Sequence, residues 1–374
     1  MSNVLINCVS AGSGGALTYL INLVPKLIER LDRENINVFL LIKEDQFDLI
    51  DKRIEKHVIM APNLGGYKRF LWEYFSLSSI IKSNDIDLIF TPYQIARIFS
   101  GIKNIVMFRN MEPFTFHKYK NTYKNSIRNY ILKLKTINTI KNTDKVIAVS
   151  GYVRDVILEN KMAGIDSIIN IYHGRNKSFN AVEDMADLEI LKALDIKGEY
   201  VFTCGSLFPY RKCEDIIKAF EDVKSSGAVL VVAGSSNDGN YINMLNDLIL
   251  QYKMSDSVHM LGHVSLQEMI VLYRNCKLFV TSTETEACPN IAIEAMSSGC
   301  NILSSDIMPL PEMFKDAAIY YKHGDLVELA EKMRNMFTSS YGVNSEALSI
   351  IESFTWDKCA DQTSDLILKE LRFQ

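Results

Sequence analysis

The feature that most constrains the fold of this chain is a regular alternation of short apolar runs with longer helical patterns. Five such runs precede a stretch of mixed polarity at residues 173–199, and five more follow it. Alternation at this spacing is typical of parallel sheets covered by helices on both faces. The runs that we expect to form strands are residues 4–9, 37–42, 88–91, 104–108 and 145–149, then 200–204, 228–233, 257–261, 278–281 and 301–304.

Two such series predict two domains, because 374 residues exceed the size of one ordinary core. We expect an α/β fold of two doubly wound, Rossmann-like domains, residues 1–174 and 175–355, facing each other across a cleft. Long helical patterns, such as 17–30 and 69–82, separate the first strands. Ligands of open parallel sheets bind beyond the carboxyl ends of the strands, so the loops there are where we look for chemistry.

Composition narrows the class of protein. Hydrophobic residues make up 48% of the chain, yet no apolar run reaches the roughly 18–20 residues needed to span a bilayer. The N-terminus lacks the pattern of a signal peptide, and the seven scattered cysteines contain no C-x-x-C pair. These features predict a cytoplasmic protein without disulfides or a zinc site. A net charge of −4 gives no general reason to expect nucleic acid.

A glycine-rich segment follows the first expected strand and opens the helix at 17–30. Its glycines are Gly12, Gly14 and Gly15, which is not the dinucleotide spacing G-x-G-x-x-G. Glycines at a strand-to-helix turn allow close approach to a phosphate at a helix N-terminus. A purely structural turn is the alternative interpretation.

A basic pair, Arg211 and Lys212, follows Gly205 and Ser206 at the start of the expected helix 213–224. Cations at a helix N-terminus are unfavourable with the helix dipole, and a bound anion would offset that cost. The pair therefore marks a candidate phosphate site. Solvated surface charge is the alternative.

The most specific signal is a pair of glutamates, Glu286 and Glu294, separated by seven residues that include Pro289. Pro289 suits the start of a helix near Asn290, so Glu286 lies on the preceding loop. Helical side chains lean toward the N-terminus, which aims Glu294 at the same cleft. Its carboxylate could accept hydrogen bonds from the two hydroxyls of a ribose. The alternative is a helix-terminal charge for Glu286 and a surface position for Glu294.

At these residues the sequence resembles glycosyltransferase family 4, a retaining family of GT-B architecture. The resemblance extends over most of the chain and is strongest at residues 200–312. It rests on the order of Leu261-Gly262-His263-Val264-Ser265, Leu272-Tyr273, Glu286 to Glu294, Ser297-Ser298-Gly299, Pro311-Glu312 and Phe354-Thr355-Trp356.

The resemblance implies a retaining transfer of sugar from a nucleotide-diphosphate sugar to a glycan or lipid-linked acceptor in cell-surface polysaccharide synthesis. It implies an acceptor-side first domain, a donor-binding second domain, and a C-terminal helix, 356–374, that crosses back to the first. No metal is required, because the basic pair stabilises the leaving diphosphate. The implied catalytic residues are Glu286, Arg211, Lys212 and Arg109, and the implied donor-binding residues are Gly14, Gly15, Gly205, Ser206, Pro289, Asn290, Ile291 and Glu294.

One position departs from the family pattern. Members often carry a histidine after the strand equivalent to 104–108, where this chain has Arg109 and Asn110. An arginine could hold the same region, and which of the two residues replaces the histidine stays open.

Residues 118–145 carry eight lysines and arginines against one acid, Asp144. On a helical wheel their apolar residues share one face, with basic residues beside it. Such a helix can lie on an anionic membrane, which would place the protein peripherally on the inner face of the cell membrane. The alternative is that the apolar face packs on the sheet. The apolar residues are Tyr119, Tyr123, Ile127, Tyr130, Leu134 and Ile137.

Three rival functions are open on sequence alone. A metal-dependent GT-A transferase needs a D-x-D after a strand, but Asp85-Ile86-Asp87 precedes one. A nucleotide-sugar epimerase and a non-catalytic nucleotide-binding scaffold share the fold, and the presence of both glutamates and the basic pair disfavours the scaffold.

Overall fold

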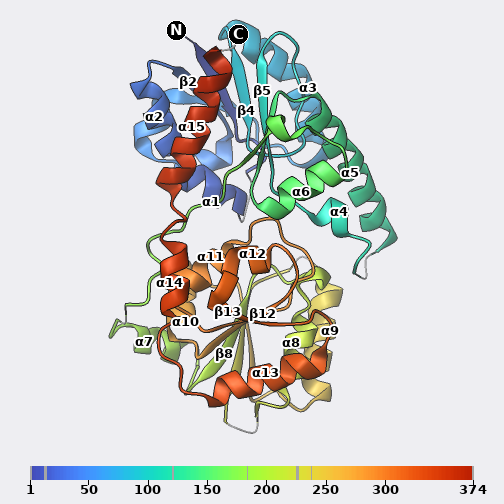
Figure 1. The fold of residues 1–374 in the computed structure, drawn as a ribbon, viewed down its shortest axis with the longest axis vertical. Helices are drawn as coiled ribbons and strands as arrows, with labels where there is room; N and C mark the ends of the chain where they lie inside the picture. The colour runs from blue at the N-terminus through green and yellow to red at the C-terminus, as the bar shows by residue number, and fades with distance from the viewer. Residues whose placement is uncertain are drawn as a thin grey trace. The chain divides into compact units, whose positions relative to one another are not determined.

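The computed structural model describes residues 2–11, 15–119, 122–182, 184–224, 227–236 and 238–372, and the chain divides into two compact units (Figure 1). Unit 1 comprises Met1–Pro113, Ile127–Gly174 and Phe354–Gln374. Unit 2 comprises Phe114–Ser126 and Arg175–Ser353. The short segment Phe114–Ser126 thus belongs to the second unit although it lies within the first strand series, which no sequence pattern indicated.

Unit 1 is built on a seven-stranded sheet of order β3-β2-β1-β4-β5-β6-β7, in which every described pair is parallel. Its strands are β1 Asn3–Asn7, β2 Asn37–Lys43, β3 Val58–Ala61, β4 Leu88–Thr91, β5 Lys103–Phe108, β6 Lys145–Ala148 and β7 Ile168–Asn170. Its helices are α1 Gly15–Asn22, α2 Val24–Arg33, α3 Gly66–Ser83, α4 Glu112–Thr115, α5 Tyr123–Asn142, α6 Gly151–Glu159 and α15 Trp356–Arg372, of which α4 and α5 extend into Phe114–Ser126.

Unit 2 repeats the plan with a six-stranded parallel sheet of order β10-β9-β8-β11-β12-β13. Its strands are β8 Tyr200–Cys204, β9 Val229–Ala233, β10 Val258–Gly262, β11 Leu278–Thr281, β12 Ile302–Ser305 and β13 Ala318–Tyr321. Its helices are α7 Asp187–Ala193, α8 Cys213–Phe220, α9 Gly239–Gln251, α10 Leu266–Asn275, α11 Asn290–Ser297, α12 Leu310–Phe314, α13 Leu326–Thr338 and α14 Ser345–Ile351.

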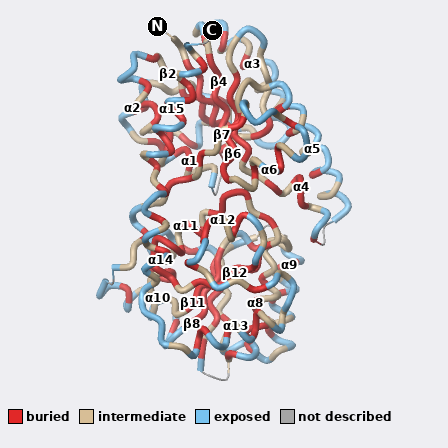
Figure 2. Tube along the Cα trace, in the orientation of Figure 1, coloured by how far each residue is buried: buried red, intermediate tan, exposed pale blue. Residues whose placement is uncertain are grey.

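The strands form the core of each unit, as Figure 2 shows by their buried colouring. Strands β4, β8 and β11 are buried along their whole length. Continuous apolar runs of this kind are expected where helices cover both faces of a parallel sheet. The predicted α/β, doubly wound class is confirmed, with all ten expected strands present.

The first helical pattern is divided. We expected one helix at 17–30, but α1 ends at Asn22 and α2 begins at Val24. Pro25 is the cause, because proline has no backbone N–H to donate and its ring clashes with the preceding turn. It sits in the first turn of α2, where the missing N–H costs nothing.

Helix α5 turns polar side chains toward the rest of the protein and exposes apolar ones. Its buried residues are Asn129, Thr136, Thr139 and Ile140, whereas Tyr123, Ile127, Tyr130 and Leu134 are exposed. The Asn129 amide donates to the Glu112 carboxylate at 3.0 Å, and the Thr139 hydroxyl donates to the carbonyl oxygen of Ala96 at 3.3 Å. The alternative interpretation, in which the apolar face packs on the sheet, is therefore wrong for these four exposed residues; Ile137 is half-buried, and Tyr119 is buried ahead of the helix, which begins at Tyr123.

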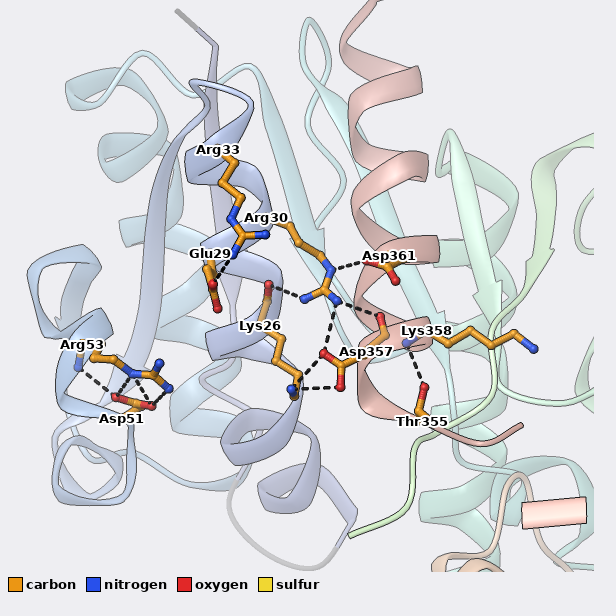
Figure 3. A network of polar contacts seen from close by, with 10 residues as sticks. All are labelled: Lys26, Glu29, Arg30, Arg33, Asp51, Arg53, Thr355, Asp357, Lys358 and Asp361. Atoms are coloured by element: carbon orange, nitrogen blue, oxygen red, sulfur yellow. Dashed lines mark hydrogen bonds and ion pairs between the residues drawn. The ribbon is translucent and has the colours of Figure 1, made fainter. Parts of the chain in front are cut away.

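The last helix, α15, packs against α2 within unit 1 (Figure 3). Lys26 Nζ lies 2.9 Å from Asp357 Oδ1, and the Arg30 guanidinium donates to Asp357 and Asp361. Trp356 is buried, and its ring stacks on His173 with centroids 5.9 Å apart. The predicted return of the C-terminal helix to the first domain is confirmed by these contacts.

The Asp85-Ile86-Asp87 triplet and the absence of a membrane-spanning segment are the two remaining expectations from the sequence. Asp85 and Asp87 lie in the turn before β4, and an oxygen of the Asp87 carboxylate accepts a hydrogen bond from the Asn3 backbone at 2.8 Å. Within the ranges described above, no helix is long and apolar enough to cross a membrane.

Candidate functional site

The loops after β8 and β9 each contain a glycine that its backbone conformation requires, and at one of them the two loops also approach closely. Gly205 and Gly234 have φ of +123° and +144°, a region that L side chains rarely adopt. A Cβ on Gly234 would lie 1.9 Å from the carbonyl oxygen of Gly205. The backbone after β8 is thereby held at the carboxyl edge of the sheet, the edge where ligands of such sheets bind.

Arg211 extends back over this glycine. It ends the short 3₁₀ helix Pro209–Arg211, and its guanidinium carbon is 3.6 Å from where a Cβ on Gly205 would stand. Its Nη1 donates to the Glu286 carboxylate, and the two side chains are only 19% and 12% exposed. Burial raises the pKa of Glu286, and the Arg211 charge lowers it in part. Arg211 and Glu286, which belong to separate sequence motifs, thus form one ion pair.

One nitrogen of the Arg211 guanidinium is buried without a partner in the described part of the chain. Its Nε–H is buried and has no hydrogen-bond partner among the described residues. Leaving a buried donor unpaired costs about 1–3 kcal/mol, so an acceptor arriving at this point would recover that free energy.

Lys212 adopts a left-handed backbone conformation, with φ of 53°, immediately before α8. Its Nζ lies 3.8 Å from Glu284 Oε2 and 4.0 Å from Glu214 Oε1. His323 Nε2 lies 3.1 Å from the other oxygen of Glu284. Lys212 is therefore held by carboxylates of the β11–α11 loop and of α8.

A serine links the two loops that carry these cations. Ser282 Oγ, directly after β11, lies 2.9 Å from the carbonyl oxygen of Arg211 and 2.8 Å from that of Lys212. Ser282 is buried. The loop after β8 is thereby fixed to the loop that carries Glu284 and Glu286.

Glu294 lies within α11, which begins at Asn290 directly after Pro289. The Tyr273 hydroxyl donates to Glu294 Oε2 at 3.1 Å and lies 2.8 Å from Cys204 Sγ. Burial raises the pKa of Glu294 to about 7, although the Tyr273 hydrogen bond and the Arg211 charge lower it in part. The carboxylate is thus enclosed with a single hydrogen-bond donor from the described protein, and it has capacity for more.

The remaining predicted residues divide between the two units. Ser206 is exposed beside Gly205, while Pro289 and Ile291 are buried at the start of α11 and Asn290 is half-buried. In unit 1, Gly15 is the first residue of α1, and Gly14 lies outside the described residues.

Arg109 follows β5 in unit 1. Its backbone N–H donates to Gln94 Oε1 at 3.3 Å, and its guanidinium carbon is 5.8 Å from the centre of the Tyr93 ring. Burial lowers the pKa of Arg109. Asn110 has a structural task instead, because its side-chain oxygen accepts from the Glu112 backbone at 2.9 Å.

Sequence reasoning did not assign roles to several residues of this site. Tyr273 stood in a quoted motif, but nothing local indicates that its hydroxyl reaches Glu294. Thr115, from the segment that joins unit 2, lies with its hydroxyl 2.6 Å from that of Thr285, next to Glu286. The other unassigned residues are Ser282, Glu284 and His323. In the part of the chain that is described, no three His, Cys, Asp or Glu side chains gather as a metal site.

Two family models match the chain, one on each strand series. "Glycosyltransferase Family 4" matches residues 13–177, and "Glycosyl transferases group 1" matches residues 189–348. The chain belongs to glycosyltransferase family 4.

Relatives of this family member agree with the assignment. It is 24% identical to the uncharacterized glycosyltransferase MJ1178 of Methanocaldococcus jannaschii, over 92% of each chain. It is also 24% identical to alpha-monoglucosyldiacylglycerol synthase of Streptococcus pneumoniae, over 81% of this chain and 72% of that one.

The fold of the family member matches solved glycosyltransferases. The Anabaena protein Alr3699/HepE, solved with UDP and glucose, superposes with a TM-score of 0.73 at 15% identity, covering 98% of this chain and 99% of that one. The predicted GT-B architecture is confirmed. The protein is a glycosyltransferase of the hexosyltransferase type that uses a nucleotide-sugar donor.

The hydroxyl of Tyr273 gives the first prediction about this site. Tyr273→Phe removes the donor to Glu294, and a hydrogen bond to a charged group is worth about 1.5–3 kcal/mol. The pKa of Glu294 should rise further, and the pH midpoint of UDP or GDP binding should move upward by about one pH unit. Calorimetric titration from pH 6 to pH 9 measures the midpoint.

Tyr200→Phe is the matched control, because Tyr200 is an equally buried tyrosine whose hydroxyl donates to the carbonyl oxygen of Leu272 at 2.8 Å. It should lose a similar amount of stability without moving the midpoint. Equal midpoints in wild type and Tyr273→Phe would show that Tyr273 serves only packing.

Proposed function

We propose that this glycosyltransferase retains the anomeric configuration of the sugar and binds its nucleoside-diphosphate donor in unit 2 without a divalent metal. The supporting observation is the position of Arg211: it lies over the Gly205 backbone, pairs with Glu286 and keeps one buried N–H without a partner. An anionic diphosphate at this point would accept from that N–H and meet the carboxyl edge of the sheet.

The proposed roles follow from chemistry at each residue. Breaking the bond between the sugar and the β-phosphate leaves negative charge on the phosphate oxygen, and preorganised cations there lower the barrier. Arg211 supplies that cation, and Lys212 adds to the positive potential. Glu286 contacts hydroxyls of the donor sugar, and Glu294 accepts from the two ribose hydroxyls.

The remaining donor contacts are backbone contacts. Gly205 and Ser206 offer the loop after β8 to the diphosphate, and Pro289, Asn290 and Ile291 form the start of α11 beside the nucleotide. In unit 1 we assign Gly14 and Gly15 to the diphosphate and Arg109 to the region of the sugar.

The acceptor we propose is a glycan or a lipid-linked glycan of cell-surface polysaccharide synthesis, reached from the inner face of the cell membrane. Two relatives support this class by name: alpha-monoglucosyldiacylglycerol synthase of Streptococcus pneumoniae, and O-antigen chain mannosyltransferase RfbU of Salmonella typhimurium. The second is 24% identical over 55% of this chain and 54% of its own.

Metal-independent donor binding is the direct test of the site. We expect UDP or GDP to bind with the same affinity in EDTA as in Mg²⁺ or Mn²⁺, because Arg211 and Lys212 supply the positive charge that a metal ion would otherwise provide. Isothermal titration calorimetry measures both conditions. Binding that requires an added divalent ion would refute the proposal, while UDP bound more tightly than GDP, or the reverse, identifies the base.

A further inference from the structure

Two neighbouring helices of unit 1 expose large apolar side chains to an unusual degree. On α3, Tyr67 and Phe75 are 70% and 72% exposed, and on α5 Tyr123 is 83% exposed. Leu71 and Tyr74 of α3, and Ile127, Tyr130, Ile131 and Leu134 of α5, are exposed as well. We call these nine side chains the α3–α5 face; Figure 2 shows much of both helices as exposed.

The two helices form one surface because they are in contact. Lys135 of α5 places its Nζ 4.7 Å from the centre of the Phe70 ring of α3. In Figure 1 the helices run beside each other along the same edge of unit 1. Contiguous apolar exposure of this kind marks an interaction site, whereas scattered single residues do not.

The apolar residues of this face are not needed to hold the helices. Helix α3 has a separate inner side, where Leu77 and Ile81 join the buried cluster of Leu5 and Leu41. Helix α5 is held by Ile140, which is buried, and by the polar contacts of Asn129 and Thr139 described above, none of which belongs to the face. The apolar side of an amphipathic helix normally faces an apolar environment. Because α5 buries polar groups and exposes aromatic ones, that environment lies on its outer side.

Charge identifies that environment. The two helices carry eight lysines and arginines and one acid, Glu73, in a chain whose net charge is −4. Glu73 is turned inward, since it accepts from the Asn7 amide at 3.0 Å and pairs with Arg69 at 3.4 Å. Lys68, Lys124 and Lys135 are exposed beside the aromatic residues. The face therefore combines apolar and tyrosine side chains with an excess of positive charge and no outward acid of its own helices.

We infer that the α3–α5 face docks onto the surface of an anionic lipid bilayer. Leucine, isoleucine and phenylalanine side chains would enter the boundary of the acyl chains, tyrosines would lie at the headgroups, and the lysines would pair with lipid phosphates. The described helices are too short in apolar length to span a bilayer, so the attachment is interfacial. This inference deepens the proposed use of a lipid-linked acceptor, and it widens the surface from residues 118–145 to a second helix.

Vesicle binding tests the inference without any nucleotide, so it is independent of the donor site. We expect the protein to bind vesicles of phosphatidylcholine mixed with phosphatidylglycerol, and to bind pure phosphatidylcholine vesicles much more weakly. Phe75→Ser/Tyr130→Ser should lower the partition coefficient by about tenfold or more, because each side chain loses the free energy of apolar burial. Lys68→Gln/Lys124→Gln/Lys135→Gln should lower it about fivefold per charge, with a weaker dependence on salt.

Val327→Ser/Leu250→Ser is the matched control, because both residues are exposed apolar positions on helices of unit 2. It should bind vesicles like wild type, and all variants should keep the wild-type melting temperature and UDP or GDP affinity. Equal binding of wild type and Phe75→Ser/Tyr130→Ser, or equal binding to neutral and anionic vesicles, would overturn the inference. So would a dimer in sedimentation velocity that Phe75→Ser/Tyr130→Ser dissociates, since the partner would then be a second copy.

Discussion

Replacing Arg211 by alanine is expected to lower kcat about 10²–10³-fold, which corresponds to about 2.7–4 kcal/mol of transition-state stabilisation. The reason is that charge on the leaving diphosphate develops as the sugar–phosphate bond breaks, and the guanidinium over Gly205 is already in place to meet it. The measurement is steady-state transfer, or hydrolysis of the donor, with the nucleotide sugar that calorimetry identifies. Lys212→Ala is the comparison, and it should lose less because Lys212 Nζ is 3.8 Å from Glu284.

Because Arg211 is ion-paired with Glu286, Arg211→Ala is expected to change stability as well as kcat, and a second variant separates the two effects. Removing Arg211 leaves a buried carboxylate without its partner, which costs about 3–5 kcal/mol of stability when a pair is fully buried. Arg211→Ala/Glu286→Gln removes the stranded charge. The double variant should regain melting temperature over Arg211→Ala while staying catalytically impaired. If the double variant recovers wild-type kcat, then Arg211 matters for folding only and the leaving-group role is wrong.

The strands that the sequence failed to predict have a common physical property. They are β3, β7 and β13, and each lies at the edge of its sheet. Central strands are buried on both faces and appear in the sequence as continuous apolar runs. These three edge strands are short and only partly buried, as Val58–Ala61 shows with a single buried residue, so their brief apolar runs are a weaker signal than those of the central strands.

Helix α5 illustrates a different limit. Its wheel correctly separated an apolar side from a polar one, but amphipathicity does not state which side faces the protein. The answer depends on Glu112 and Ala96, which receive hydrogen bonds from Asn129 and Thr139. Partners that lie far away in the sequence cannot be found from periodicity alone.

The candidate site shows the same division between local and distant information. Local order was sufficient to find Gly205, the basic pair and both glutamates, because each follows a predicted strand of unit 2. The pairing of Arg211 with Glu286, across 75 positions of sequence, follows only from the strand order β8-β11. The support of Glu294 by Tyr273 is likewise a contact between α10 and α11 that no spacing rule predicts.

Glu294→Gln is expected to make the free protein more stable at pH 8 while weakening nucleotide binding. Burial raises the pKa of Glu294 to about 7, above the ordinary glutamate value of 4.5. The folded state therefore holds a proton that the unfolded chain has lost between those two values. This bound proton stabilises the folded state by up to about 3 kcal/mol. The stabilisation is complete below about pH 4.5 and is lost as the pH rises through about 7.

Glutamine is neutral at every pH, so it avoids this loss, and its side-chain oxygen can still accept from Tyr273. Differential scanning calorimetry should show Glu294→Gln melting above wild type at pH 8, by several degrees, with the difference closing toward pH 5. Nucleotide affinity at pH 8 should fall about tenfold or more, because one acceptor for the ribose hydroxyls becomes a donor. Below pH 7 the wild type should lose affinity more steeply than the variant, whose remaining pH dependence belongs to the phosphate.

Glu286→Gln is the comparison variant, because Glu286 is a buried carboxylate with an ion-pair partner and Glu294 is a buried carboxylate without one among the described residues. Glu286 is ion-paired, so its replacement leaves the Arg211 guanidinium buried without a counter-charge, and this variant should melt below wild type at pH 8. Opposite signs for two glutamates on one loop and helix are thus expected from their partners alone. A Glu294→Gln protein that melts below wild type at pH 8 would show that the ionised carboxylate is already well satisfied in the free protein. The argument that Glu294 gains its missing hydrogen bonds from a ribose would then lose its physical basis.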